Sequence, residues 1–130
     1  MIALIPDVAR PALSQENSAE QSEEATPKFL PPAYEAQMMR LAEILGALHY
    51  LRDLCKADED QLWREQMQQL IEMEDPSEVR KAQLTARFNQ GFRGFREIYR
   101  ECTDSAIEAN NRYITEGGKI SAEIPSRYGR

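Results

Sequence analysis

Cys55 and Cys102 are the two cysteines of this 130-residue chain, and their spacing predicts that they bond to each other. They lie at nearly equal distances on either side of residues 75–78, where Pro76 gives the strongest turn signal between two helical patterns. Two helices that fold back at this turn would bring both thiols to one level. We expect a structural disulfide, because the chain has no Cys-x-x-Cys motif and neither thiol lies at an obvious helix N-terminus that would lower its pKa. Two buried free thiols are the main alternative.

His49, the single histidine, is the other candidate for a chemical role, either as a metal ligand or as a general base. Without a second histidine, and with both cysteines assigned to each other, an ordinary zinc site lacks ligands. As a general base His49 would need a nucleophile and an orienting acid, and its neighbour Asp53, one helical turn on, is more simply a surface partner. No glycine-rich phosphate loop, Gly-x-Ser-x-Gly element or Rossmann fingerprint is present. We expect a non-enzymatic protein with no metal and no cofactor.

Charge is divided unevenly along the chain. Residues 57–78 carry eight acidic residues and one arginine, whereas residues 79–102 carry six basic and two acidic residues. Attraction between the two strips, or an ordinary solvated helix surface, explains most of this pattern. A surface that docks a protein partner is the alternative. Its candidate residues are Arg93, Arg96 and Arg100 on the basic strip, or His49 and Arg52 on the preceding helix.

The overall composition argues against two other classes of partner. A net charge of −6 disfavours nucleic acid, which is bound through dense lysine and arginine. The aromatic residues among the arginines of the basic strip have helical spacing, which is typical of a buried core stripe rather than of a base-stacking platform. No run of about 18 apolar residues is present, so we expect no membrane span.

Apolar residues at helical spacing predict an all-α fold for residues 33–130. The expected helices cover residues 34–57, 58–73 and 79–116, with a kink or a break near Asp58. The last helix would be a rod of roughly 55–60 Å, which needs a partner along its whole length. We therefore predict an elongated antiparallel helical hairpin with a kinked or broken first arm, cross-linked by one disulfide. A three-helix bundle is the alternative.

The cysteine pair also sets an antiparallel register for the hairpin. Partners in this register have numbers that sum to the same value as those of the cysteines, so Leu51 would face Ala106 and Leu62 would face Phe95. Gly46 lowers the local bulk of the first arm, which would let a neighbouring helix approach closely. Beyond the hairpin, the tail carries Ile120, Ile124 and Tyr128, which could dock near Tyr34 and Met38 or form a strip that recognises a partner.

The N-terminal segment does not read as part of the helical domain. Residues 1–14 resemble the end of a secretion signal, with a short apolar stretch and a small-residue pattern before Gln15; a disordered end is the alternative. Residues 14–32 are acidic and poor in apolar residues, which is typical of a flexible leader. We therefore assign residues 1–32 to a signal remnant and a disordered acidic leader.

Several motifs together resemble an uncharacterised helical protein family of alphaproteobacteria, whose members usually carry a secretion signal. The resemblance covers about residues 33–130. The motifs are Leu45-Gly46-x-Leu48-His49-Tyr50-Leu51-Arg52-x-Leu54-Cys55, Phe88-Asn89-x-Gly91-Phe92-Arg93-x-Phe95, Cys102-Thr103, Arg112-Tyr113-x-x-Glu116-Gly117 and the ending Arg127-Tyr128-Gly129. The family supplies no reaction or site, but the resemblance implies a periplasmic setting. A disulfide agrees with that setting, because disulfides persist in oxidising compartments.

Three functions follow as hypotheses. The first is a non-enzymatic periplasmic protein that binds a cell-envelope protein and regulates or scaffolds it. A peptidoglycan hydrolase is a concrete example of such a partner. The second is a small ligand-binding protein or enzyme that uses the polar surface around His49. The third is a structural envelope protein that assembles with itself.

Overall fold

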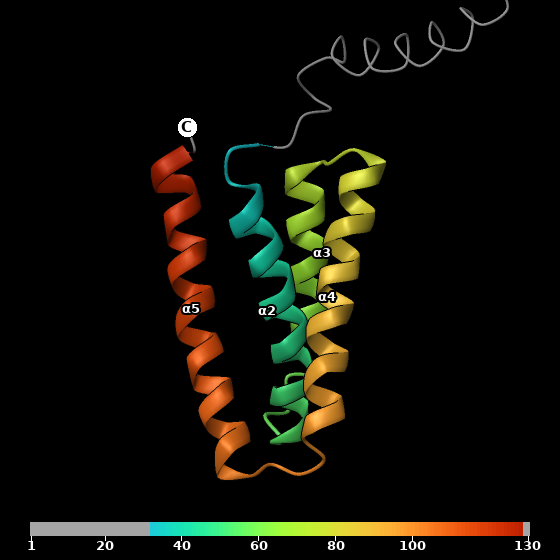
Figure 1. Ribbon diagram of the computed structural model, residues 1–130, viewed down its shortest axis with the longest axis vertical. Helices are drawn as coiled ribbons and strands as arrows, with labels where there is room; N and C mark the ends of the chain where they lie inside the picture. Colours follow the sequence, from blue (N-terminus) through green and yellow to red (C-terminus); the bar gives the residue numbers. More distant parts are fainter. Residues whose placement is uncertain (1–31, 129–130) are drawn as a thin grey trace, which may run out of the picture. The chain divides into compact units, whose positions relative to one another are not determined.

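The computed structural model describes residues 32–128, and within this range the chain forms four helices that alternate in direction (Figure 1). They are α2 (Glu35–Leu54), α3 (Leu62–Glu74), α4 (Glu78–Ile98) and α5 (Asp104–Tyr128). No strand is present in this part of the chain, so the all-α prediction is confirmed. The expected signal remnant and nearly all of the expected leader lie outside the described residues.

Helix α2 is the centre of the domain and contacts each of the other three helices. It is buried on most sides, which requires apolar or small residues around nearly the whole helix. Ala42, Gly46 and Ala47 leave room for neighbouring backbones, while Ile44 and Leu51 are fully buried large side chains. The buried residues form three clusters around α2. These are Met38, Ala42, Leu45, Met67, Leu84 and Phe88; Leu41, Ile44, Leu48 and Ile120; and Leu51, Ala106 and Ala109.

The single long helix expected over residues 79–116 is wrong, because the chain reverses after Ile98. Tyr99 has an extended backbone, and the hydroxyl of Tyr50 donates a hydrogen bond to its carbonyl oxygen. Thr103 then caps α5, since its Oγ1 accepts a hydrogen bond from the amide of Ala106 at 3.1 Å. A continuous helix would extend beyond the 20-residue α2 and leave half of its apolar stripe uncovered. Folding back places that half against α2 instead.

The first arm also reverses near Asp58, as a three-helix bundle requires, so it is not a kinked rod; the break after Ile98 adds a fourth helix. Residues 55–61 turn the chain, with left-handed backbone at Lys56, Asp58 and Asp60. Helix α3 therefore returns along α2, and the hydroxyl of Tyr34 donates a hydrogen bond to a carboxylate oxygen of Glu74 at 2.8 Å. Charged and short polar side chains in the turn cannot enter the core, which favours a reversal over a continued helix. The elongated hairpin is thus replaced by four helices.

One half of the predicted register holds and the other does not. Leu51 packs in one cluster with Ala106, and Arg40 Nε donates to Glu116 Oε2 at 2.7 Å, so α5 runs antiparallel to α2 as expected. Phe95 does not face Leu62. Its ring packs edge-on against Tyr113 of α5, with ring centres 5.2 Å apart.

The tail is helical rather than separate from the preceding helix. Ile120 is buried against α2, and Ile124 packs against the cluster that contains Met38, as predicted for docking. Gly117 does not end α5 as expected. It lies inside the helix, where an added Cβ would come 3.1 Å from a methyl group of Ile44. The glycine therefore serves close packing against α2.

Helices α2 and α4 pack backbone to backbone through one glycine from each. A Cβ added at Gly46 would lie 1.8 Å from the carbonyl oxygen of Phe88, and one added at Gly91 would lie 2.0 Å from that of Glu43. No side chain fits in either position. The close approach expected at Gly46 is confirmed, and the helix that approaches is α4.

The cysteine pair lies where both reversals meet. The two sulfur atoms are at disulfide-bonding distance, with Cα atoms 5.0 Å apart, so the predicted pairing of Cys55 with Cys102 is confirmed. Cys55 follows α2 and Cys102 precedes α5, so the bond links the α2–α3 turn to the α4–α5 turn. The two cysteines still meet, because the chain also reverses near each of them, at similar distances before and after Pro76.

Replacing Lys56 with glycine is expected to stabilise the domain by about 0.5–1 kcal/mol, because Lys56 occupies a left-handed position that glycine adopts without a Cβ clash. Its φ is 59°, its amide donates to Asp53 O at 3.0 Å, and the next amide, of Ala57, donates to Arg52 O at 2.9 Å. This is a Schellman-type end of α2. Chemical denaturation of the oxidised protein measures the change. Lys56→Ala is the control, since it keeps the Cβ and should bring no gain; an equal gain in both variants would contradict this reason.

Candidate functional site

A groove of about 760 Å³ lies between α3 and α4 and is the best candidate for a binding site. Both helices rest on α2 but make few contacts with each other, so their facing sides are left open. The groove is lined by His49 of α2; Gln61, Arg64, Glu65, Met67, Gln68, Ile71 and Glu72 from the α3 side; and Lys81, Thr85, Phe88, Asn89 and Phe92 of α4. It is open to solvent along its length and combines apolar with polar side chains.

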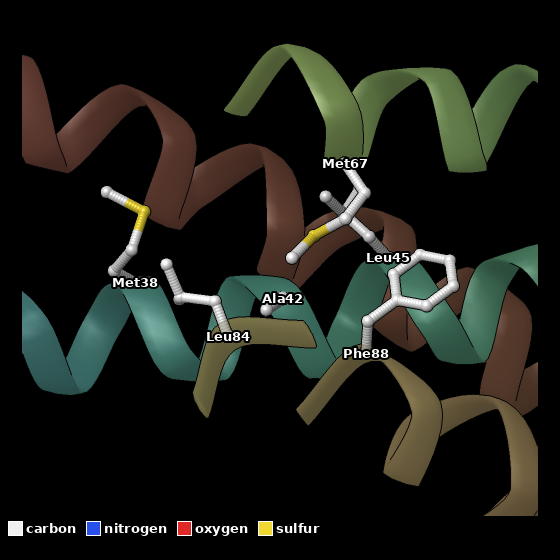
Figure 2. Packing of buried hydrophobic residues seen from close by; sticks show 6 residues of the cluster. All are labelled: Met38, Ala42, Leu45, Met67, Leu84 and Phe88. Atoms are coloured by element: carbon white, nitrogen blue, oxygen red, sulfur yellow. The ribbon is translucent and has the colours of Figure 1, made fainter. Parts of the chain in front are cut away.

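The floor of the groove is part of the hydrophobic core. Figure 2 shows Met67 descending from α3 and Phe88 rising from α4, so that the two side chains meet beside Leu45 of α2. Met67 is 7% exposed and Phe88 is 8% exposed, so only their edges reach the groove. The floor is therefore rigid and apolar, which suits contact with another apolar surface.

Two charged clusters hold α3 at its ends. Near its C-terminus, Arg80 of α4 donates to Glu35 at 2.6 Å and to Glu74 at 3.0 Å, and its guanidinium is almost completely buried. Near its N-terminus, Glu59 accepts hydrogen bonds from Arg52 at 3.0 Å and from Trp63 at 2.7 Å. The hydrogen bond from Arg52 lowers the pKa of Glu59 below its usual value. Between these ends Met67 is the one buried residue of α3.

The predicted partner-binding residues do not share one face. His49 is half-buried and lines the groove, whereas Arg52 forms an ion pair with Glu59 and does not line it. Arg93 and Arg96 are exposed on α4, and Arg96 lies with its Cζ 5.4 Å from the centre of the Phe92 ring at the groove. Arg100 is apart from them, since it lines a separate hollow beside the disulfide. His49 and Arg96 are therefore brought together through Phe92.

His49 lies against the aromatic side of α4. Its ring centre is 5.4 Å from that of Phe92 and 5.9 Å from that of Phe88. Burial lowers the pKa of His49 below its usual value, the charge of Arg64 lowers it further, and Asp53 opposes both effects. The neutral imidazole is thus the favoured form at neutral pH, and the ring lines the groove.

Stability is expected to fall as the pH drops below about 6.5, because the unfolded chain then binds a proton that folded His49 resists. The contribution of His49 is fully present above the unfolded pKa and is lost as the pH falls toward the lower folded pKa. Urea denaturation at pH values from about 7.5 to 5.5 measures it. His49→Gln should flatten the dependence in this window, while Glu59, with its lowered pKa, acts only in more acidic solution. An unchanged slope in the variant would contradict the assignment.

Groove residues other than His49 were not predicted as functional from the sequence. Met67, Ile71, Phe88 and Phe92 have the helical spacing of core residues, and sequence alone does not reveal that part of each faces an opening. Arg64 is the sole basic residue in an acidic segment, which is the one signal that could have drawn attention to it.

Among residues 32–128, no group of three or more His, Cys, Asp or Glu side chains is placed to hold a metal ion. Every helix that these residues form is too short or too polar to cross a membrane. The side chains that line the groove can form hydrogen bonds, ion pairs and apolar contacts.

The chain belongs to a family described as "Protein of unknown function (DUF2385)", which matches residues 33–128. The match spans all four helices described here. No curated protein and no solved structure matches the chain.

Proposed function

We propose that this member of the DUF2385 family is a non-enzymatic periplasmic protein that binds a helical segment of a cell-envelope protein in the α3–α4 groove. By holding that segment it would regulate or scaffold its partner. The observation that carries the proposal is the groove itself, with a rigid apolar floor between two polar helical walls. A groove of this kind accepts the apolar face of an amphipathic helix, while the polar walls set its position.

The cysteine bond supports the proposed compartment. A disulfide that links two turns of a small domain is useful where thiols are oxidised and is rarely maintained where they are kept reduced. The oxidising periplasm satisfies this requirement. The resemblance noted from the sequence motifs agrees with the same setting.

A peptidoglycan hydrolase is the concrete partner that we favour, because such enzymes operate in the periplasm and often require protein activators. Deleting the gene should then disturb cell separation. With purified components, adding the protein should change the activity of the hydrolase. Unchanged hydrolase activity would remove this version of the proposal and leave other envelope partners.

The groove is tested by filling it without disturbing the core. Asn89 is exposed and lines the groove, whereas its neighbour Gln90 is also exposed and does not line it. Asn89→Trp should abolish binding and reproduce the deletion phenotype, while Gln90→Trp should behave as the natural protein. Circular dichroism would confirm that both variants remain folded. Normal function of Asn89→Trp would show that the groove is not the binding site.

A photo-crosslinking residue allows binding in the groove to be tested inside the cell. Incorporated at Gln68, which lines the groove, it should capture one discrete envelope protein. Incorporated at Lys119, on the exposed side of α5, it should not capture that protein. Equal capture from both positions would argue that the groove has no special role.

Two observations favour alternative functions. His49 lines the groove together with several amide side chains, which would also suit a small polar ligand or the site of a small enzyme. Met73 is 87% exposed and Val79 is 67% exposed at the α3–α4 turn, which would suit self-assembly into an envelope structure. Light scattering across a range of protein concentrations separates a self-assembling protein from a monomeric adaptor.

A further inference from the structure

We propose that α3 is a hinged wall of the groove. Its N-terminal end would swing away from α2, while its C-terminal end stays attached at Arg80. This inference rests on the proposed function, since it states how the groove opens to admit the helix of a partner. The burial of α3, the backbone at its two ends and the contacts that hold each end support it.

Little buried surface holds α3 in place. Met67 is the one buried residue of this 13-residue helix, whereas α4 buries Leu84, Phe88 and Gly91 along its length. The glycine contact between α2 and α4, and the cluster of Leu51 with α5, form without α3. Segments with few buried apolar contacts open locally at a lower free energy than the whole domain. Helix α3 can therefore open while α2, α4 and α5 remain folded.

The backbone on both sides of α3 is unfavourable, since every non-glycine residue with left-handed backbone in 32–128 flanks this helix. Lys56, Asp58 and Asp60 lie in the turn before it, with φ of 59°, 59° and 55°. Asp75 ends it, with φ of 47°. Such backbone costs free energy in residues that have a Cβ, aspartate less than lysine, and it is common in segments that switch conformation. Because more of these residues precede α3 than follow it, opening its N-terminal end relieves more strain.

The C-terminal end of α3 is attached by a buried network. Glu74, its last residue, accepts a hydrogen bond from the hydroxyl of Tyr34 at 2.8 Å and one from Arg80 at 3.0 Å. The side chains of Arg80 and Glu74 are 10% and 13% exposed. Separating such a pair is costly, because each charge would stay buried without its partner. This end is therefore the pivot.

The N-terminal end of α3 is held by a more exposed latch. Glu59 accepts hydrogen bonds from Arg52 at 3.0 Å and from Trp63 at 2.7 Å. The side chains of Arg52 and Glu59 are 29% and 23% exposed, so water can replace their contact at lower cost. Trp63 packs against two of the core clusters, which makes the open form a minor state. Release of the latch widens the groove beside His49.

Hydrogen exchange of the full oxidised chain tests the inference without a partner. After correction for intrinsic rates, the amides of residues 65–68 should exchange at least about tenfold faster than the slowest amides of α4. Low concentrations of urea should hardly change the rates at 65–68, because opening one end of α3 exposes little surface, whereas the slowest amides should respond steeply. Residues 71–73 should exchange more slowly than 65–68, because the pivot holds them.

A matched pair of substitutions identifies the latch. Glu59→Gln weakens the N-terminal attachment of α3, and Glu43→Gln weakens an ion pair of similar exposure, with Arg87, between α2 and α4. Glu59→Gln should accelerate exchange at residues 65–68 about fivefold, the effect of losing one partly exposed ion pair. Glu43→Gln should leave these rates unchanged, because the pair with Arg87 stays intact when α3 alone opens. It should accelerate the amides that exchange by global unfolding.

Trp63 gives an independent readout, since it is the only tryptophan of the chain. Opening of the latch withdraws its ring from the core clusters. Acrylamide should therefore quench its fluorescence more strongly in Glu59→Gln than in the natural protein, and Glu43→Gln should match the natural protein.

The inference is overturned if residues 65–68 share the urea dependence of the slowest amides, or if both substitutions accelerate them equally. In either case α3 opens when the whole domain unfolds. If residues 71–73 exchange as fast as 65–68, α3 detaches as a whole and Arg80 is not a pivot.

These results are distinct from a failure of the proposed function, which Asn89→Trp measures. If α3 opens at one end but Asn89→Trp functions normally, the hinge stands and its role in binding fails with the proposed function. If Asn89→Trp abolishes binding but α3 does not open, the groove binds its partner in the closed form and the inference alone fails.

Discussion

Replacing both Cys55 and Cys102 with alanine is expected to lower the free energy of unfolding by about 4 kcal/mol. The bond closes a loop with a sequence separation of 47 residues, and removing it restores that conformational freedom to the unfolded chain. Little packing is lost, since Cys102 is exposed and Cys55 is half-buried. For a domain of this size, the loss would be a large fraction of the total stability.

Denaturation of the oxidised natural protein and of the double variant measures this change directly. The natural protein treated with a reducing agent is the matched control, and it should lose a similar amount of stability. If the double variant and the oxidised protein unfold within about 1 kcal/mol of each other, the cross-link is not a main source of stability. The argument for an oxidising compartment would then lose much of its force.

Gly91→Ala is expected to destabilise the domain by about 3 kcal/mol or more, because the new methyl group has no space. It would lie 2.0 Å from the carbonyl oxygen of Glu43 and 2.9 Å from the amide nitrogen of Ala47. Both of these atoms belong to the backbone of α2, so relief requires the two helices to separate. Separation would open the core on both sides of the contact.

Gly94→Ala is the matched control on the same helix. Apart from the backbone of its own helix and its chain neighbours, no atom lies within 4 Å of a Cβ added at Gly94, so this substitution carries only the helix-propensity gain of about 0.5–1 kcal/mol. The two alanine variants should therefore move the denaturation midpoint in opposite directions. A Gly91→Ala protein as stable as the natural one would show that α2 and α4 can separate at little cost.

The sequence was most informative where two residues had to meet. The cysteine pairing and its register correctly placed α5 against α2, because both depend on chain reversals at equal distances from Pro76. The close approach at Gly46 was also predictable, since the absence of a side chain is a local property. The helix that approaches Gly46 was not predictable, because nothing local links it to Gly91.

The reversal after Ile98 was not predicted, because no turn-forming glycine or proline marks it. No glycine or proline lies between Tyr99 and Thr103, and the apolar stripe continues across the break. Thr103 followed by Asp104 is a helix-start signal that could have been noticed. What decides the break is tertiary: α2 is shorter than the rod that would otherwise run beside it, and Tyr50 binds the carbonyl oxygen of Tyr99.

The groove was the least predictable feature, for a related reason. Its walls are two helices that are neighbours in sequence, and neighbouring helices usually close against each other. Here both turn their main apolar contacts toward α2, so Met67 and Phe88 serve as core residues and as the floor of an opening at once. Hydrophobic periodicity does not distinguish these two roles.

Arg80 lies where three helices meet, and its side chain joins the two walls of the groove at one end. From α4 it binds Glu35 of α2 and Glu74 of α3, and it is 10% exposed, so dissolved salt screens these pairs little. At the opposite end Arg52 of α2 binds Glu59, which precedes α3, and no ion pair among the described residues joins α3 to α4 there. The spacing of the walls is therefore fixed at the Arg80 end, whereas at the His49 end it can adjust to the size of a bound helix.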